Sequence, residues 1–547
     1  MPPLATPKDL ATEATLPAVL DAYAATYPDQ LLVLADDQRA TAAELADTAR
    51  RFAGHLKAQG LRPGDVIGAL LPNGWRWLVI ALGAHYAGVV FVPLNTFYRE
   101  SELKEAVERT HLSVLYSDRE FFNRDYADLF DSAGLMGPVE GTAFRGTVIW
   151  PRSDRSPEGV DLDDVEPVSQ SLAAPDDTAF YVFTSGSSAQ PKIVVLNHRN
   201  LIDNCYEIGR RQHLVVGDRL WMASPLFFGY GCANALLVVL THGLTFCLQE
   251  RFHPLESARF MAENECTVYY GLGPMTRDLI SAGAHMKFDL SRLRTGTTGF
   301  TAEDKRIAIE VLGVSEVCSV YGLTEGNGHS AMTDGHDELA VTLHTQGTAL
   351  PTQEMRIADP TTGEVLASDD EPHMGEIQLR GCVTTGYLED PASNEKGFTV
   401  DGWFRTGDLG WLDSDARLHF AGRLKEVVKV NGITVSPAEV EAVLLGHDDV
   451  DQVWAFGWPS AEDGEERLCC AVVLGGRRSA AEVHDELRAW MRARISSYKV
   501  PELFVVLRED EIPMTATGKV SKRLIGERFV GGVVGGAVGV GHAGGAA

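Results

Sequence analysis

The sequence predicts an α/β protein in which helices are layered on parallel sheets. Segments with helical periodicity alternate with short apolar segments of strand length through about the first 340 residues. This helix-then-strand order recurs at 77–94, 199–213, 255–269 and 301–321. From about 345 to 421 the pattern changes to short strands with turn residues, which indicates a small β-rich subdomain. A separate C-terminal unit begins near Gly422.

The N-terminal elements follow from the spacing of apolar residues. Residues 41–59 place apolar side chains on one helical face and stop before Gly60, and 66–71 is an apolar run of strand length. The most apolar stretch, 77–94, is interrupted by two glycines and a histidine. Since a membrane-spanning helix needs about 18 or more uninterrupted apolar residues, we expect a buried helix and a core strand there, and no integral membrane segment.

The C-terminal unit follows a linker at 422–426. Its first helix is predicted to begin with Ser436 as N-cap, Pro437 in the first turn and Glu439 closing a capping box, and to end at Gly446. The segment 529–547 is rich in Gly, Ala and Val and is expected to be disordered. The predicted domains are an N-terminal core over 1–422, with the β-rich subdomain at 345–421, a C-terminal domain over 423–528 and the tail.

The composition limits the partners. Lys and Arg number 48 and Asp and Glu number 76, which gives a net charge of −28. Because nucleic acids and anionic membranes repel such a chain, we expect neither as a partner, and a polyanionic ligand must be held by a local site. The eight cysteines show no C-x-x-C spacing, and the N-terminus lacks a signal-peptide pattern. Both features favour a cytoplasmic location.

One loop has the composition of a phosphate site. The apolar strand 181–183 leads into Thr, Ser and Gly residues and then Lys192. Small residues let backbone N–H groups and hydroxyls approach phosphate oxygens, and the lysine adds a positive charge. It is not a Walker A loop, because Pro191 replaces the second glycine and Ile193 stands where Ser or Thr is needed. The structural alternative is a flexible surface loop.

Five motifs in order then resemble one family. They are TSGSSAQPK at 184–192, VYGLTE at 320–325, GWFRTGDL at 402–409, GRLK at 422–425 and PMTATGKV at 513–520. From about 15 to 527 the chain resembles the ANL adenylate-forming superfamily, which includes acyl- and aryl-CoA synthetases, peptide-synthetase adenylation domains and firefly luciferases. The loop departs from the family pattern at Ser188, Ala189 and Ile193.

The resemblance implies both a fold and residue roles. The N-terminal part would hold two layered α/β subdomains and a β-barrel-like subdomain, and the small α+β C-terminal domain would be mobile. The implied nucleotide-binding residues are Thr184, Ser185, Gly186, Ser187, Ser188 and Lys192 at the phosphates, Tyr321 on the adenine, Thr324 at the α-phosphate, Asp408 at the ribose, Arg423 near ribose and phosphate, and Lys519. The implied catalytic residues are Lys519, Thr324, Glu325 and Lys429. Mg²⁺ would be held by Glu325 and Thr184, Lys425 would be the hinge, and Gly432 would accompany Lys429 in the second half-reaction.

These roles suit the chemistry of the side chains. A hard cation prefers carboxylate and phosphate oxygens, which fits Glu325. The carboxylate of Asp408 can accept hydrogen bonds from two vicinal hydroxyls. The ammonium of Lys519 would offset the repulsion between a substrate carboxylate and the α-phosphate.

The acyl pocket of this family is lined partly by the segment that is SPLFFGYGCAN at 224–234 here. Phe228, Tyr230 and Gly231 resemble the pocket of benzoate-type CoA ligases, and two aromatic residues flanking a glycine would form a flat slot for a ring. This favours an aryl or small cyclic acid over a long chain. The alternative is that Phe228 serves core packing alone.

The predicted reaction uses ATP, Mg²⁺ and CoA. A small carboxylic acid would react with ATP to give acyl-AMP and pyrophosphate, and CoA would then displace AMP to give a thioester. The first alternative keeps adenylation but changes the acceptor to a carrier-protein thiol, an amine or nitrite, as in ATP-dependent diazotases. The second is a non-catalytic, adenylate-binding regulator. A homodimer is left open.

Overall fold

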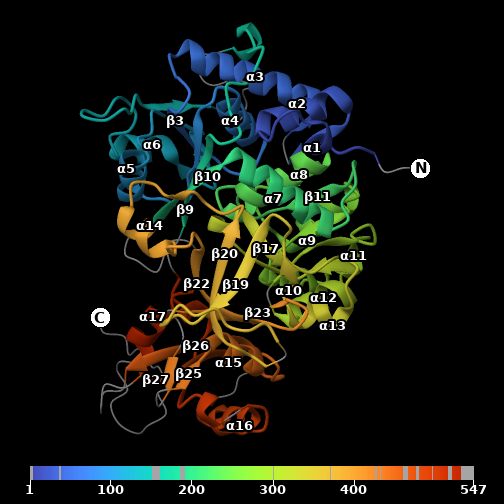
Figure 1. The fold of residues 1–547 in the computed structure, drawn as a ribbon, viewed down its shortest axis with the longest axis vertical. Coiled ribbons are helices and arrows are strands. Elements are labelled where there is room, and N and C mark those ends of the chain that lie inside the picture. The colour runs from blue at the N-terminus through green and yellow to red at the C-terminus, as the bar shows by residue number, and fades with distance from the viewer. Residues whose placement is uncertain are drawn as a thin grey trace. The chain divides into compact units, whose positions relative to one another are not determined.

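The computed structural model describes the chain in twelve segments, which belong to two compact units (Figure 1). These segments are 4–35, 38–150, 161–184, 191–299, 301–369, 371–424, 428–430, 433–459, 466–475, 480–495, 497–514 and 520–530. The larger unit comprises Met1–Arg356, Gln378–Arg405 and Ser414–Leu418. The smaller unit comprises Ile357–Ile377, Thr406–Asp413 and His419–Ala547, so it draws on the β-rich stretch as well as on the C-terminal residues. The predicted boundary at 422 stays a prediction.

The larger unit contains two seven-stranded sheets. The first has the order β15(Glu316–Cys318)-β14(Thr295–Thr297)-β13(Val268–Tyr270)-β11(Arg219–Met222)-β12(Thr245–Leu248)-β1(Leu31–Ala35)-β2(Arg39–Thr41). The second has the order β21(Gly386–Tyr387)-β10(Lys192–Asn197)-β9(Thr178–Thr184)-β4(Val90–Pro93)-β3(Val66–Leu70)-β5(Val114–Ser117)-β8(Thr147–Ile149). Pairing is parallel in both sheets except for β2 on β1 and for β10 on both β9 and β21.

Helices cover these sheets and lie between them. The helices of this unit are α1(Pro7–Leu10), α2(Leu16–Thr26), α3(Ala42–Ala58), α4(Trp75–Tyr86), α5(Glu100–Arg109), α6(Tyr126–Ser132), α7(His198–Arg211), α8(Leu236–His242), α9(Pro254–Glu263), α10(Gly273–Ser281), α11(Ala284–Lys287), α12(Ala302–Glu310), α13(Leu339–His344) and α14(Pro391–Gly397). Helix α7 packs on β10 of the second sheet and on α8, which packs on β12 of the first. This pair therefore joins the two sheets, as Figure 1 shows in green.

Short antiparallel strands complete the larger unit. They are β16(Val320–Leu323), β17(Gly328–Met332) and β18(Thr348–Ala349) in one sheet, and β6(Glu120–Phe121) with β7(Arg124–Asp125) in another. The unit boundaries then run through or beside β19(Gln353–Ala358), β20(Gly375–Gly381), β22(Phe404–Leu412) and β23(Leu418–Arg423), the strands of the predicted β-rich stretch. In the described parts of this stretch no closed barrel forms, so the barrel-like detail is not observed.

The C-terminal segment of the smaller unit forms a small α+β layer. Its strands are β24(Val428–Val430), β25(Ile433–Val435), β26(Val450–Pro459), β27(Glu466–Leu474) and β28(Leu503–Val506), and its helices are α15(Pro437–Leu444), α16(Ala480–Arg492) and α17(Lys522–Ile525). Strand β27 pairs antiparallel with β26 and parallel with β28. Helices α15 and α16 contribute Val440, Leu444, Val483 and Leu487 to one core, all fully buried.

The predicted α/β class is confirmed, and so are individual elements. Helix α3 has Thr41 as its N-cap in a capping box with Glu44, because the hydroxyl and the carboxylate satisfy backbone N–H groups of the first turn. Strand β3, helix α4 and strand β4 occupy the predicted apolar segments. Among the helices of the described residues, none combines the length and hydrophobicity that a membrane crossing requires.

Two predictions at the C-terminal end need correction. Ser436 is the N-cap of α15, but its side chain makes no capping hydrogen bond; its hydroxyl donates to the carbonyl of Ala421 instead. The tail does not begin at 529, because Gly526–Val530 is a π-helical turn in which Phe529 and Val530 pack against a hydrophobic cluster. Residues 531–547 of the predicted disordered tail lie outside the described residues.

Candidate nucleotide and acyl site

The two ends of the predicted phosphate loop are held together by strand pairing. Thr184, the last residue of β9, is the register partner of Lys192, the first residue of β10. The Thr184 hydroxyl donates to the Lys192 carbonyl at 3.5 Å. Ser185, Gly186, Ser187, Ser188 and Ala189 lie outside the described residues. The structure thus fixes where the loop leaves and re-enters the sheet.

A tyrosine joins the predicted phosphate lysine to the predicted magnesium ligand. The ammonium of Lys192 lies 4.1 Å from the ring centroid of Tyr387, within the range of a cation–π contact. The hydroxyl of Tyr387 donates a hydrogen bond to Oε1 of Glu325 at 2.9 Å. The sequence analysis missed Tyr387, since a Gly-Tyr pair in a two-residue strand carries no recognisable chemical signal.

The Glu325 turn is pinned by backbone hydrogen bonds. Thr324, Glu325 and Gly326 form the short 3₁₀ turn η3(Thr324–Gly326) between β16 and β17. The Glu325 carbonyl accepts from the backbone N–H of Thr384 at 2.6 Å, and the Gly326 carbonyl accepts from the Gln353 side-chain amide at 2.8 Å. The Glu325 carboxylate is therefore carried by a rigid support, as precise cation binding requires. Tyr321, the predicted adenine contact, is buried in β16.

The side chains of this region fit a magnesium–triphosphate group. Glu325 offers a carboxylate, Thr184 a hydroxyl and Lys192 a cation. Within the part of the chain that the structure describes, no salt bridge joins Lys192 or Glu325 to an opposite charge. Neither group is therefore neutralised by a direct salt bridge among these residues.

The predicted acyl residues lie next to this turn. A Cβ atom on Gly229 would stand 2.6 Å from Oγ1 of Thr324, so only glycine allows this close approach without displacing Thr324. Gly231 begins the π-helical segment η2(Gly231–Ala235), a feature that is frequent at functional sites. The half-buried ring of Phe228 contacts Phe227, with centroids 4.5 Å apart.

Tyr230 makes both an aromatic and a polar contact. Its ring stacks on Tyr270 with centroids 5.5 Å apart, and its hydroxyl lies 2.5 Å from Oγ1 of Thr297. The ring of His329 is 6.3 Å away and is hydrogen-bonded to the Asn234 amide at 2.9 Å. Burial lowers the pKa of His329 to about 4, so its imidazole is neutral near pH 7. The sequence analysis missed His329 and Asn234, which come from separate segments.

In the smaller unit the predicted ribose residues contact each other. Nε of Arg423 lies 3.0 Å from Oδ1 of Asp408, whose side chain is only 3% exposed. The backbone N–H of Asp408 donates to the Thr406 hydroxyl at 3.1 Å, and Gly407 has the left-handed φ of 70° that favours glycine. The structure thus brings together two residues that the sequence placed on the ribose side of the nucleotide.

The remaining predicted residues cannot be placed. Lys425, Gly432 and Lys519 lie outside the described residues. The backbone of Lys429 pairs with Thr434 across β24 and β25, but its side chain is not described. Met514 and Val520, which flank the Lys519 motif, form an isolated antiparallel bridge.

Comparison with known proteins gives consistent matches along the whole chain. Residues 20–388 match the family model described as AMP-binding enzyme, and residues 439–519 match the AMP-binding enzyme C-terminal domain. The 3-[(3aS,4S,7aS)-7a-methyl-1,5-dioxo-octahydro-1H-inden-4-yl]propanoyl:CoA ligase of Mycobacterium tuberculosis is 32% identical over 520 residues, which cover 93% of this chain and 97% of that protein.

Solved structures agree with these sequence matches. The ATP-bound MatB from Rhodopseudomonas palustris has a TM-score of 0.82 and 25% identity, covering 95% of this chain and 99% of its own. The o-succinylbenzoate CoA synthetase from Bacillus subtilis, in complex with the acyl-adenylate OSB-AMP, has a TM-score of 0.76 and 25% identity, covering 93% and 97%.

Proposed function

We propose that this chain, which belongs to the family of AMP-binding enzymes, activates a carboxylic acid with ATP as an acyl-AMP and then transfers the acyl group to CoA. The observation that carries the proposal is the arrangement of Lys192, Tyr387 and Glu325, in which the ammonium lies over the face of the tyrosine ring and the carboxylate is bonded to its hydroxyl. Relatives named as CoA ligases, and solved relatives that hold ATP or an acyl-adenylate, support the same reaction.

In the first half-reaction a carboxylate oxygen of the acid attacks the α-phosphorus of ATP. The bond from that phosphorus to the bridging oxygen breaks, and pyrophosphate leaves with the electron pair. We assign Lys192 to bind phosphate oxygens, and we assign Thr324, whose hydroxyl lies beside Gly229, to donate to the α-phosphate. Lys519 is assigned the role of reducing repulsion between the two anions. When bound, Mg²⁺ supplies charge neutralisation at the phosphates, and Glu325 and Thr184 are the residues that would hold it.

In the second half-reaction the CoA thiol attacks the acyl carbonyl carbon and AMP leaves. AMP is a far better leaving group than the original carboxylate oxygen, which is the energetic purpose of adenylation. We assign Lys429 and Gly432 to this step and Lys425 to the hinge that exchanges them for Lys519. The acceptor is the least constrained part of the proposal, and a carrier-protein thiol, an amine and nitrite remain its alternatives.

For the substrate we propose an aryl or small cyclic acid. Phe228 and Tyr230 are partly exposed flat rings, Tyr270 stacks on Tyr230 from the core, and stacked or edge-on ligand rings pack well against such surfaces. The relative at 32% identity is named for a bicyclic propanoyl substrate, which is consistent with a ring-binding slot. The cytoplasmic location and the homodimer remain predictions.

A panel of acids tests this proposal. Purified protein is given ATP, Mg²⁺ and either benzoates, alicyclic and bicyclic propanoic acids, or straight-chain acids from C8 to C16, with pyrophosphate release measured with and without CoA. We expect pyrophosphate release with a ring-containing acid and thioester formation only with CoA. A clear preference for the straight chains would overturn the ring assignment. Acid-dependent pyrophosphate release without any CoA thioester would favour another acceptor, and no release with any acid would favour the non-catalytic regulator.

A further inference from the structure

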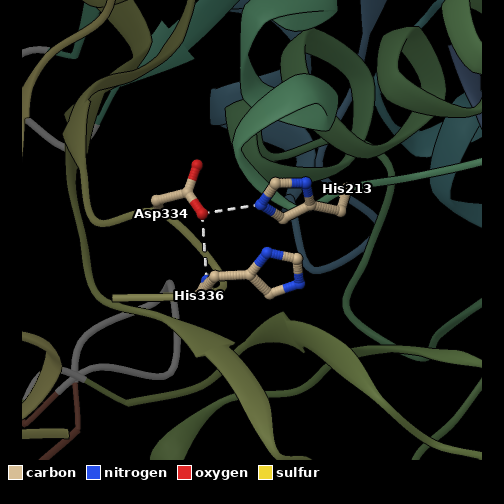
Figure 2. A group of neighbouring side chains, drawn as sticks. All are labelled: His213, Asp334 and His336. Carbon is tan, nitrogen blue, oxygen red and sulfur yellow. Dashed lines mark hydrogen bonds and ion pairs between the residues drawn. The ribbon is translucent and has the colours of Figure 1, made fainter. Parts of the chain in front are cut away.

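Three side chains in the larger unit form a cluster that the proposed reaction does not use. Nε2 of His213 lies 2.6 Å from Oδ1 of Asp334, and the rings of His213 and His336 stack with centroids 3.8 Å apart and an interplanar angle of 11°. Figure 2 shows the His213 imidazole directed at the Asp334 carboxylate and the His336 imidazole lying against the His213 ring. One nitrogen or oxygen from each residue lies within 4.8 Å of the others.

The backbone holds these side chains in place. His213 follows helix α7 and has a φ of 51°, a left-handed conformation in which histidine is enriched but still uncommon. The loop after β17 is tied to the same helix, because the N–H of Gly335 donates to the Arg211 carbonyl at 2.8 Å. The N–H of His336 donates to Oδ1 of Asp334 at 2.9 Å. Two segments far apart in sequence are thus brought to one point before any ligand binds.

A second carboxylate lies beside the cluster. Nε2 of His336 lies 3.6 Å from Oε1 of Glu316. Asp334 and Glu316 thus place two carboxylates next to the two imidazoles, and their negative charge favours a bound cation.

We propose that His213, Asp334 and His336 bind one Zn²⁺ ion. Two imidazole nitrogens and one carboxylate oxygen are a donor set typical of zinc, whereas Mg²⁺ and Ca²⁺ prefer oxygen ligands alone. The ion takes the place of the hydrogen bond between Nε2 of His213 and Oδ1 of Asp334, and the neutral His213 ligand carries its proton on Nδ1.

Closing the site requires only a side-chain movement. Donor atoms around a tetrahedral zinc ion lie roughly 3.3 Å apart, so the ligand atoms, which lie within 4.8 Å of one another, must move closer together. The His336 side chain is 61% exposed and can rotate toward the other two ligands. A cavity of about 510 Å³, bordered by His213 and Asp334, gives access for the ion and for a water molecule as fourth ligand. The bound ion would link helix α7 to the segment after β17 and stabilise the folded unit.

The test measures zinc binding directly on the full chain. Protein dialysed against a chelator is titrated with Zn²⁺ by calorimetry in excess Mg²⁺, and Co²⁺ is used as a spectroscopic probe of nitrogen coordination. We expect one site per chain, a higher melting temperature with Zn²⁺, and visible absorption of bound Co²⁺. His336→Gln and Asp334→Asn should each weaken Zn²⁺ binding by more than about 100-fold, because each removes a ligand.

His111→Gln is the matched control. His111 is an exposed histidine whose Nε2 lies 2.9 Å from Oε1 of Glu389, with no second histidine in the pair. The control variant should bind Zn²⁺ as the parent protein does. The proposal is overturned if the parent protein binds no Zn²⁺, if His336→Gln with an unchanged melting temperature binds it equally well, or if His111→Gln causes the same loss.

Discussion

The phosphate region of the larger unit and the ribose region of the smaller unit differ in whether their opposite charges form a direct ion pair. Lys192 and Glu325 are separated by the ring and the hydroxyl of Tyr387, which interact with each charge without neutralising it. Asp408 and Arg423 instead form a direct ion pair at 3.0 Å. The first region thus has two opposite charges that form no direct ion pair, whereas the carboxylate of the second region is paired with an arginine.

This difference has a functional consequence. In the proposed reaction, Lys192 and Glu325 would stabilise the negative charge that changes on the phosphate oxygens, so we expect them to contribute to the rate. A balanced carboxylate is better suited to accept hydrogen bonds from neutral hydroxyls, which are the same before and during the reaction. We therefore expect substitutions in the first region to lower kcat, and substitutions in the second to raise KM for ATP.

The largest expected effect is on the rate of adenylation, and it comes from a lysine of the smaller unit. Lys519 belongs to the smaller unit, yet its assigned role is in the chemistry. Lys519→Ala should lower the rate of adenylation about 10²–10³-fold, as for loss of one preorganised electrostatic group, measured by acid-dependent pyrophosphate exchange. The matched control is Lys522→Ala, since Nζ of Lys522 lies 2.7 Å from Oε1 of Glu441 in a structural pair. Adenylation near the parent rate in Lys519→Ala would show that the assignment of this lysine is wrong.

The next largest effect belongs to the phosphate region. Glu325→Gln keeps an oxygen for the Tyr387 hydroxyl but removes the charge, so kcat for adenylation should fall about 10²-fold and more Mg²⁺ should be needed for half-maximal rate. Glu389→Gln, an exposed carboxylate paired with His111, is the control. An unchanged Mg²⁺ requirement in Glu325→Gln would exclude this carboxylate as the metal ligand.

The ribose region should show a smaller effect of a different kind. Asp408→Asn should raise KM for ATP about tenfold with little change in kcat, because a charged acceptor of hydroxyl hydrogen bonds is lost. Asp401→Asn is the control, since Asp401 forms an Arg–Asp pair with Arg356 at 2.7 Å outside the proposed site. A fall in kcat without a change in KM would contradict the expectation that the ribose region affects ATP binding and not the chemical step.

The smallest effect concerns the tyrosine between the two charges. Tyr387→Phe keeps the ring beside Lys192 and removes the hydroxyl that positions Glu325, so the adenylation rate should fall about fivefold, equivalent to about 1 kcal/mol. As a positioning residue, Tyr387 should act through Glu325. The loss should therefore shrink when Tyr387→Phe is combined with Glu325→Gln. Fully additive losses would mean that the hydroxyl acts elsewhere.

The sequence predictions were accurate where the interacting residues are close together in the sequence, and they failed where the partners are far apart in it. Helix α3 and strand β3 could be predicted because local periodicity and capping residues determine them. Ser436 is the predicted N-cap, but its predicted capping box does not form, because its hydroxyl bonds to Ala421, a partner 15 residues away. Tyr387 and His329 were missed because their importance arises only when distant segments meet. The motifs identified the residues Lys192 and Glu325, but only the structure revealed what separates them.

Isotope transfer tests the central claim most directly. The protein is incubated with ATP, Mg²⁺, CoA and an acid substrate labelled with ¹⁸O in both carboxylate oxygens, and the released AMP is analysed by mass spectrometry. If the carboxylate attacks the α-phosphorus and CoA then displaces AMP, each AMP carries one ¹⁸O atom and the thioester retains the other. Unlabelled AMP, or ¹⁸O found instead in inorganic phosphate, would contradict adenylation at this site.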